Sequence, residues 1–252
     1  MKFSIVTATY NSEKTVRECI ASVNRQTHVD IEHFFIDGRS ADSTLMIIRR
    51  ETHRNTWIIS EHDNGIYDAL NKGIALAGGD VIGLLHSDDL LASDTVIEEI
   101  NRVFMQTGAD VVYGDLIYFM GHDSDKIFRY WKSRPFDRSL AAKGWMPAHP
   151  SVFIRREVFK RYGLFDLQFK IASDYDFMLR IMLAPDLRFE YLPLVITKMR
   201  TGGSSNCSVN NIIRKSSEDY RAMRKNGLHH PLRVLRRKNL SKVNQFFIKY
   251  DQ

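Results

Sequence analysis

Cysteine is scarce in this sequence, and long apolar runs do not occur in it. The two cysteines, Cys19 and Cys207, are far apart and match no metal-binding or redox spacing, so we expect free thiols in a reducing compartment. No segment approaches the roughly 18 to 20 unbroken apolar residues of a membrane-spanning helix. Met1 leads into a strand-like segment without a signal-peptide pattern. We therefore expect a cytoplasmic protein.

The sequence also lacks a Gly-rich phosphate loop with a following Lys or Arg near its first apolar segment. This absence disfavours a nucleotidyltransferase that makes nucleotide sugars, a rival class that would also use a Rossmann-like sheet and acidic metal ligands. Internal repeats and low-complexity regions are absent as well. With 252 residues and 44% apolar content, the chain is long enough for one substantial core.

Positive charge is concentrated at the C-terminal end. The net charge is +6, and residues 212–252 hold eleven Lys/Arg and three Asp/Glu, or +8, which leaves −2 for residues 1–211. We therefore expect a domain over 1–211 and a basic amphipathic helical tail over 212–252. The tail is either a solvated helix packed on the domain or an attachment to the anionic cytoplasmic leaflet. Its apolar residues include Leu228, Leu232, Val234, Leu235, Leu240, Val243, Phe246, Phe247 and Ile248.

Strand-like and helical patterns alternate along the first hundred residues. The expected strands lie at 3–11, 32–38, 56–63 and 80–89, and the expected helices between them at 12–26, 40–51 and 65–77. This alternation predicts parallel β-α-β units in a Rossmann-like sheet flanked by helices, with ligands bound beyond the carboxyl ends of the strands. Further on we expect a helix over 93–108, a strand over 109–119, and helical segments over 157–166 and 174–184.

Two carboxylates, Asp88 and Asp89, follow the apolar run VIGLL. They are therefore expected at the edge of the sheet. Mg²⁺ and Mn²⁺ prefer oxygen ligands and commonly use one or two carboxylates plus substrate phosphates, so a site for a metal and a diphosphate is workable here. The alternative is that both residues cap the helix beginning near Ser93, or are solvated turn residues.

Other polar residues at segment ends have two interpretations each. Asp37, before Gly38, is either a turn former or an acceptor for the N–H of a nucleobase. Asp174 begins a helical segment, so it is either a helix cap or a general base that takes the proton of an acceptor hydroxyl, with Asp176 as the next candidate. His149 and Trp145 share one loop, where they either pack or contact the acceptor or a donor phosphate.

In order and spacing, four of these segments resemble glycosyltransferase family two, the large inverting family with the GT-A fold, over roughly residues 3 to 200. SIVTATYN resembles its first strand, IDGRSADST its DDGSTDGT segment, and GIYDALNKGIALAGGDVIGLLHSDD the stretch leading into its metal-binding DxD motif. GLFDLQFKIASDYDFMLR resembles the region that ends in the family's Glu-Asp, which supplies the base. The resemblance implies Asp174 as catalytic base, Asp88 as ligand of Mn²⁺ or Mg²⁺, and donor binding by Ala8, Tyr10, Asp37, Asn71, His86, Ser87 and Asp88.

Two positions depart from the family pattern. His86 replaces the first Asp of DxD, which leaves Asp88 as the expected metal ligand. Ser173 replaces the Glu before the catalytic Asp, which leaves Asp174 as the matching base candidate. The segment SEHDNGIYDALNKGI also resembles the corresponding segment of the bacterial enzymes that build exopolysaccharides and O-antigens.

The resemblance implies an inverting transfer of a sugar from a nucleotide-sugar donor, with UDP favoured by the family, to a hydroxyl of a glycan or lipid-linked acceptor. Cell-surface polysaccharide synthesis at the inner face of the plasma membrane is the expected setting. Besides donor and acceptor we expect an anionic membrane surface as a partner, and no nucleic acid. The other rival, a non-enzymatic membrane- or nucleic-acid-binding module, is suggested by the basic tail and explains none of the strand-end acids.

Overall fold

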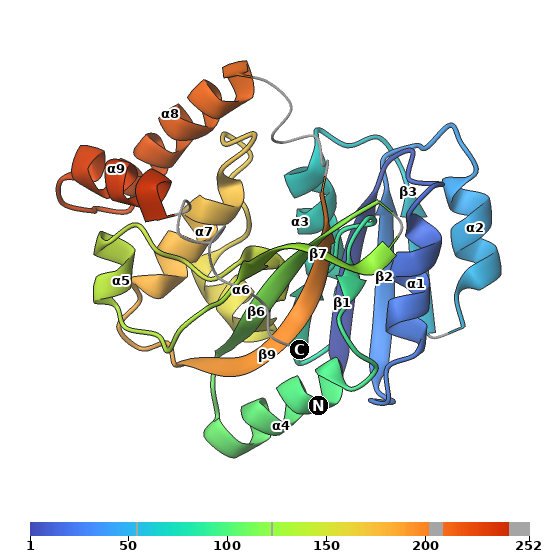
Figure 1. Cartoon of the computed structure of the whole chain (residues 1–252). Coiled ribbons are helices and arrows are strands. Elements are labelled where there is room, and N and C mark those ends of the chain that lie inside the picture. Colours follow the sequence, from blue (N-terminus) through green and yellow to red (C-terminus); the bar gives the residue numbers. More distant parts are fainter. Residues whose placement is uncertain (54, 122, 202–208, 242–252) are drawn as a thin grey trace.

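The computed structural model describes residues 1–53, 55–121, 123–201 and 209–241. A twisted sheet runs through the molecule, with helices on both of its faces (Figure 1). In the described residues the strand order is β3-β2-β1-β4-β8-β6-β9-β5, with β7 paired to β6. No described helix is long and apolar enough to cross a bilayer.

The first half of the sheet is parallel throughout. Its strands are β1 (Phe3–Thr9), β2 (Ile31–Asp37), β3 (Asn55–Ser60) and β4 (Val81–Leu84). The helices that connect them are α1 (Val16–Asn24), α2 (Thr44–Glu51) and α3 (Ile66–Leu76). The predicted β-α-β units are therefore confirmed, and their carboxyl strand ends meet at one edge of the sheet.

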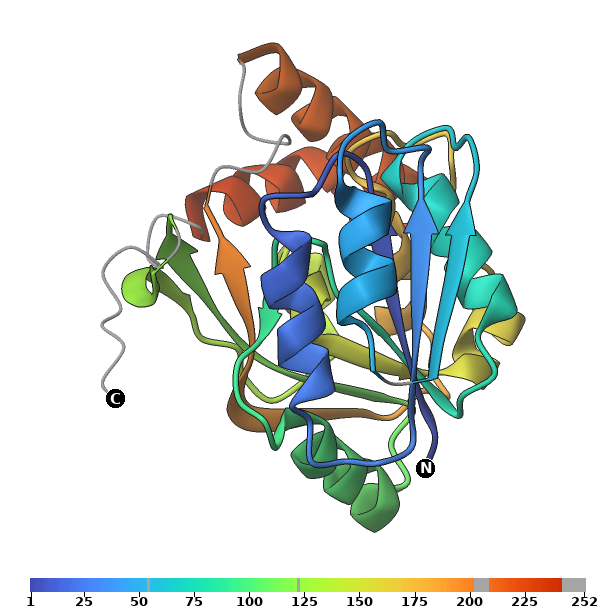
Figure 2. The ribbon, with the colours of Figure 1, turned by 90° about the vertical axis from the view of Figure 1, so that its right-hand side faces the viewer.

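Side chains on successive strand residues point to opposite faces, so the two faces of the parallel sheet have different cores. On one face Phe35 of β2 packs with α1 and α2, which Figure 2 shows side by side over the strands. On the other face Phe34 and Ile36 pack with α3. Gly73 allows this close approach, because a Cβ there would lie 2.3 Å from Cγ1 of Val6 on β1.

The second half of the sheet is mixed. β8 is antiparallel to both β4 and β6, and β9 is parallel to β6. Its strands are β5 (Leu90–Leu91), β6 (Val111–Met120), β7 (Asp123–Trp131), β8 (Val152–Arg155) and β9 (Phe189–Arg200). The associated helices are α4 (Val96–Thr107), α5 (Ser139–Ala142), a 3₁₀ turn at His149–Ser151, α6 (Arg156–Tyr162) and α7 (Ser173–Met182).

The C-terminal segment forms two helices, α8 (Val209–Lys225) and α9 (Pro231–Ser241), at the end of the molecule away from α1 and α2 (Figure 1). Ala222, Met223, Leu228 and Val234 are buried in the same core as α7. The boundary expected at residue 211 therefore falls inside α8, and both helices pack on the domain. Of the apolar tail residues, Val243, Phe246, Phe247 and Ile248 lie outside the described residues.

Candidate active site

A broad cleft of about 1430 Å³ opens at the carboxyl ends of β1, β2 and β4. Open α/β sheets bind their ligands at this position. The predicted donor-binding residues that line the cleft are Ala8, Tyr10, Ser87 and Asp88. Arg200 and Thr201, at the end of β9, also line it, which brings the two halves of the sheet to one cavity.

Tyr10 presents an aromatic surface in this cleft, with 67% of the residue exposed. A Cβ on Gly38 would lie 3.4 Å from the Tyr10 ring and 2.5 Å from Oδ2 of Asp63. Glycine at this position therefore keeps space open beside a ring and a carboxylate, which suits a planar heterocycle with N–H donors. Sequence reasoning did not single out Asp63, although it ends the segment expected as the third strand.

Asp37 lies beneath the cleft. The residue is fully buried, and its carboxylate accepts hydrogen bonds from the hydroxyls of Thr9 at 3.1 Å and Ser60 at 2.7 Å. Ser40 donates both its N–H, at 3.0 Å, and its hydroxyl. These four donors use the roughly four lone-pair positions of a carboxylate. Asp37 therefore joins the ends of β1, β2 and β3, and a contact with the nucleobase remains a prediction.

The two acids after β4 differ in their surroundings. Asp88 lines the cleft, and burial raises its pKa while the charge of Arg200 partly offsets the rise. Asp89 is fully buried, and burial raises its pKa well above the ordinary value. Its Oδ1 accepts the N–H of Arg200 at 3.2 Å, and its Oδ2 has no hydrogen-bond partner among the described residues. Neither acid caps α4, because Thr95 is the N-cap and no side-chain cap hydrogen bond forms there.

Four acids line the cleft, Glu13, Asp42, Asp63 and Asp88, and Asp88 is the one that the sequence predicts as the ligand of a divalent cation. Within the described ranges no group of three His, Cys, Asp or Glu side chains is arranged to hold a metal ion. Mg²⁺ often needs only one or two protein carboxylates when a bound phosphate supplies further oxygens. A nearby cation would also relieve the desolvation of ionised Asp88. The residues therefore fit a cation that binds together with a diphosphate.

A second cavity, of about 270 Å³, contains Asp174, His149 and Trp145. The structure thus brings together the predicted base and the two residues predicted to contact the acceptor or a phosphate. Several aromatic residues that sequence reasoning did not single out complete its walls: Tyr67, Tyr118, Trp131 and Tyr175. A cavity that combines several aromatic side chains with charged groups is suited to a sugar ring.

Asp174 is held by two side chains. Its Oδ2 lies 3.0 Å from Nδ1 of His149, and its Oδ1 accepts a hydrogen bond from the Tyr67 hydroxyl at 3.1 Å. Burial by itself would raise the pKa of Asp174, but the charge and hydrogen bond of His149, with Lys238 and Lys215, hold this pKa below its ordinary value. Asp174 is therefore ionised at neutral pH. Since α7 has no side-chain cap hydrogen bond, Asp174 does not cap it.

His86 lies next to His149, one residue before Ser87 of the cleft. Its Nε2 lies 3.1 Å from Nε2 of His149, which in turn contacts Asp174 through Nδ1. Burial, with the charge of His149, lowers the pKa of His86 to about 3, so its ring is neutral. Because His86 comes two residues before Asp88, this chain of contacts places the DxD-like acid and the base candidate at the same edge of the sheet. His86 does not itself line the cleft.

Helix α3 helps to place the segment that enters α7. Asn71 donates to the carbonyl of Phe165 and accepts its N–H, both at 2.9 Å, so this predicted donor-binding residue lies away from the cleft. The Tyr67 hydroxyl, one turn earlier, lies 2.8 Å from the carbonyl oxygen of Ile171. From α8, the Glu218 carboxylate accepts the N–H groups of residues 171 and 172 at 2.7 and 3.0 Å. These contacts fix the N-terminus of α7 and therefore Asp174.

The neighbours of Asp174 have structural roles. Ser173, in place of the family's Glu, is fully buried and donates to the carbonyl of Asp166 at 2.8 Å. Asp176 is also fully buried and pairs with Arg180 at 2.6 Å and with Lys225 at 3.0 Å. Asp176 lines neither cavity. The geometry therefore favours Asp174 over Asp176 as the base.

A Rossmann-like sheet whose parallel strands end on one nucleotide-sized cleft, with an acid at the strand end that faces it, is the arrangement expected of a glycosyltransferase of the GT-A fold. Comparison with known proteins places the chain more closely. Residues 4–163 match the glycosyl transferase family 2, and the chain belongs to this family. The resemblance seen in the sequence is thereby confirmed.

Curated relatives extend beyond the matched segment. The chain is 32% identical over 218 residues to a PGL/p-HBAD biosynthesis glycosyltransferase of Mycobacterium bovis (strain BCG / Pasteur 1173P2), covering 82% of this chain and 80% of that protein. It is 31% identical over 186 residues to an uncharacterized glycosyltransferase of Mycobacterium tuberculosis (strain CDC 1551 / Oshkosh), covering 71% and 68%.

Solved structures confirm the fold. S. aureus TarS 1-349 superposes with a TM-score of 0.71 at 20% identity, covering 100% of this chain and 76% of that one. The mannosyltransferase PcManGT from Pyrobaculum calidifontis, in complex with GDP-Man and Mn²⁺, superposes with a TM-score of 0.67 at 18% identity, covering 94% and 68%. At these identities the likeness concerns the GT-A fold alone.

Proposed function

We propose that this glycosyltransferase is an inverting enzyme that binds a UDP-sugar in the cleft and transfers the sugar to an acceptor hydroxyl in the aromatic cavity. The observation that carries the proposal is the chain of contacts His86–His149–Asp174, which begins one residue before Ser87 of the cleft and ends at Asp174 in the second cavity. In the proposal, a donor bound near Asp88 presents its sugar toward this ionised carboxylate. Asp88, Ser87, Ala8 and Tyr10 then contact the donor.

In the proposed reaction Asp174 accepts the proton of the acceptor hydroxyl while the hydroxyl oxygen attacks the anomeric carbon of the donor sugar. The bond from that carbon to the diphosphate oxygen breaks, and the electron pair leaves with the diphosphate. Attack opposite to the leaving group inverts the anomeric centre. In the described part of the cavity the other carboxylate is Asp219, which is paired with Lys238 at 2.7 Å. A covalent sugar–enzyme intermediate is therefore disfavoured, since it needs a second free carboxylate.

Asp88 would hold the Mn²⁺ or Mg²⁺ ion that accompanies the diphosphate. Such an ion acts as a Lewis acid on the charge that develops on the leaving group. Arg200 adds a fixed positive charge in the same cleft, and its Nη2 is held 2.6 Å from Oε2 of Glu18. The metal-bound complex of PcManGT supports this proposal.

We place the reaction at the inner face of the plasma membrane, in cell-surface polysaccharide synthesis with a glycan or lipid-linked acceptor. The outer face of α9 supports this setting. Leu232 and Leu240 are 70% and 59% exposed, Arg236 lies between them on the same helix face, and Arg233, Arg237 and Asn239 are exposed as well. Exposed leucines that alternate with arginines match an anionic bilayer surface.

A panel of nucleotide sugars, assayed for nucleoside diphosphate release with Mn²⁺ or EDTA, tests the proposed function. We expect turnover of a UDP-sugar, as the TarS complex with UDP-GlcNAc suggests, and loss of turnover in EDTA. Asp88→Asn should weaken metal-dependent donor binding and turnover together. Release of pyrophosphate would instead identify a nucleotidyltransferase, and full activity in EDTA would remove the cation from the mechanism.

A further inference from the structure

The cavity beside Asp174 contains a lysine that has no direct salt-bridge partner among the described residues. Lys215, on α8, is half-buried and lines this cavity. It forms no ion pair or hydrogen bond with any residue in the described ranges. Outside those ranges the sequence contains one acid, Asp251. Its charge acts on ionised Asp174 in the same cavity, but the two side chains form no direct ion pair, so the Lys215 ammonium can pair with an anion that a ligand brings.

The two other basic residues of the cavity are held by its walls. The Lys238 ammonium lies 2.7 Å from Oδ1 of Asp219 and 3.2 Å from the centre of the Tyr175 ring. The Arg129 guanidinium lies over the rings of Tyr118 and Trp131, at 4.8 and 5.7 Å from their centres. Both cations therefore build the cavity, whereas Lys215 is available to a ligand.

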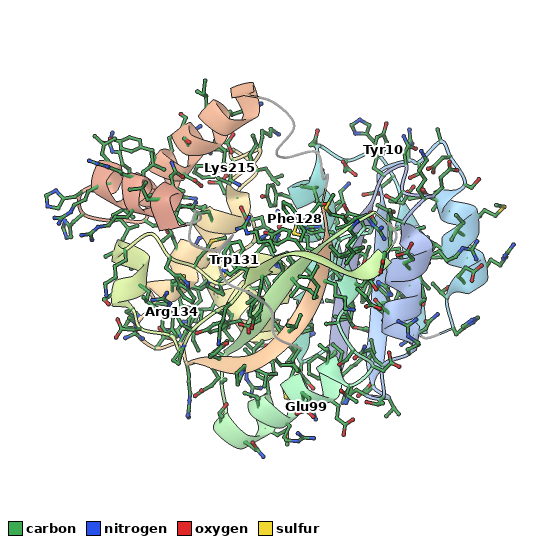
Figure 3. All side chains as sticks on the ribbon, viewed as in Figure 1. Tyr10, Glu99, Phe128, Trp131, Arg134 and Lys215 are labelled. Carbon is green, nitrogen blue, oxygen red and sulfur yellow. The ribbon has the colours of Figure 1, made fainter. Side chains whose placement is uncertain are left out.

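The cavity is small, and aromatic side chains form part of its walls. Its volume of about 270 Å³ lies just below the ~300–1000 Å³ usual for small-molecule sites, which suits one sugar ring with a substituent. Figure 3 shows Lys215 on α8 and Trp131 on the sheet, and both line this space. Trp145 and Tyr67 complete an aromatic surface beside Asp174.

The phosphates of the donor do not account for Lys215. Three basic residues, Lys14, Arg39 and Arg200, line the donor cleft together with Asp88. Arg200 lines the donor cleft and Lys215 does not. An anion bound at Lys215 would therefore belong to the molecule that occupies the second cavity.

We propose that Lys215 binds a phosphate group carried by the acceptor, next to the hydroxyl that Asp174 deprotonates. This inference rests on the proposed function and names the chemical class of the acceptor, a phosphate-bearing sugar. The phosphate has two possible sources, a lipid carrier or a phosphorylated glycan. Phosphate binding has a second effect, because the charge of Lys215 helps to lower the pKa of Asp174. Neutralising Lys215 would raise that pKa and strengthen the base when the acceptor is bound.

Binding of three probes to the full chain tests this site: glucose, glucose 6-phosphate and glucosyl octyl phosphate. Two of the three tryptophans, Trp131 and Trp145, line the cavity. With the third removed by Trp57→Phe, tryptophan fluorescence reports on this cavity. We expect both phosphates to bind more tightly than glucose. Lys215→Met should weaken phosphate binding about ten- to hundredfold, the range of a charge-assisted hydrogen bond, and leave glucose binding unchanged. Lys160→Met, at an exposed pair on α6, is the matched control.

Preference for the octyl probe would assign the phosphate to a lipid carrier, and equal binding of the two phosphates would assign it to a glycan. Unchanged phosphate binding in Lys215→Met, or glucose bound as tightly as its phosphate, would overturn the proposal. Release of nucleoside diphosphate from the donor panel is measured on the same variants. If no nucleoside diphosphate is released but phosphate binding still depends on Lys215, the result would count against the proposed function and not against this site.

Discussion

Replacement of Lys238 by Met should destabilise the whole domain, although Lys238 lies in the segment expected to be a tail. Its side chain is 7% exposed and that of its partner Asp219 is 2% exposed. Lys238→Met keeps a similar apolar length and leaves the Asp219 carboxylate buried without its cation. Removing one partner of a buried ion pair costs about 3–5 kcal/mol, so the free energy of unfolding should fall by about that much in urea.

Asp219→Asn added to Lys238→Met should recover much of this loss, because no charge then remains buried. Lys160→Met is the surface control, since Lys160 and Glu157 are 57% and 70% exposed and such pairs contribute about 0–1 kcal/mol. If Lys238→Met lowers the free energy of unfolding no more than the control does, the packing of α9 against α7 and α8 would be refuted.

Two further predictions concern the base and the core. In His149→Gln the pKa of Asp174 should rise toward its ordinary value, so the acid limb of the kcat/KM profile should move to higher pH; an unmoved limb would contradict the role of His149. Because the pKa of Asp174 is lower in the folded state, Asp174 adds to the free energy of unfolding at pH values above its unfolded pKa of about 3.9. This contribution is lost as the pH falls through the folded pKa, and His149→Gln should reduce it. Gly73→Ala should lower the unfolding free energy by about 1–3 kcal/mol, because the new methyl group would lie 2.3 Å from Cγ1 of Val6; wild-type stability in urea would refute the close packing of α3 on β1.

The parallel half of the fold was predictable because its signals are local. Apolar segments that alternate with amphipathic helices lie within about thirty residues of one another, and short connections constrain them to neighbouring positions. The mixed half depends on pairings between distant segments, such as Tyr113 of β6 with Tyr191 of β9. Nothing in either segment alone indicates its partner, and the two-residue strand β5 is too short for a periodicity.

The same distinction applies to the site. Tyr10 and Asp88 could be placed in the cleft because each follows a strand whose end is visible in the sequence. Asp37 has the same signal, but hydroxyl groups from three separate segments occupy its carboxylate. The contact of Asp174 with Tyr67 spans 107 residues, and Lys215 reaches its cavity through the packing of α8 on α7. Such contacts follow from the tertiary structure and have no local pattern.

The central claim is that Asp174 is the base of a glycosyl transfer whose donor binds elsewhere, and Asp174→Asn tests it most directly. The measurement is nucleoside diphosphate release from the donor that the panel identifies, alongside calorimetric binding of the nucleoside diphosphate with Mn²⁺. Loss of a positioned general base lowers the rate by roughly 10²- to 10⁴-fold, while binding at Tyr10 and Asp88 should be unchanged. A near-normal rate in Asp174→Asn would contradict the account.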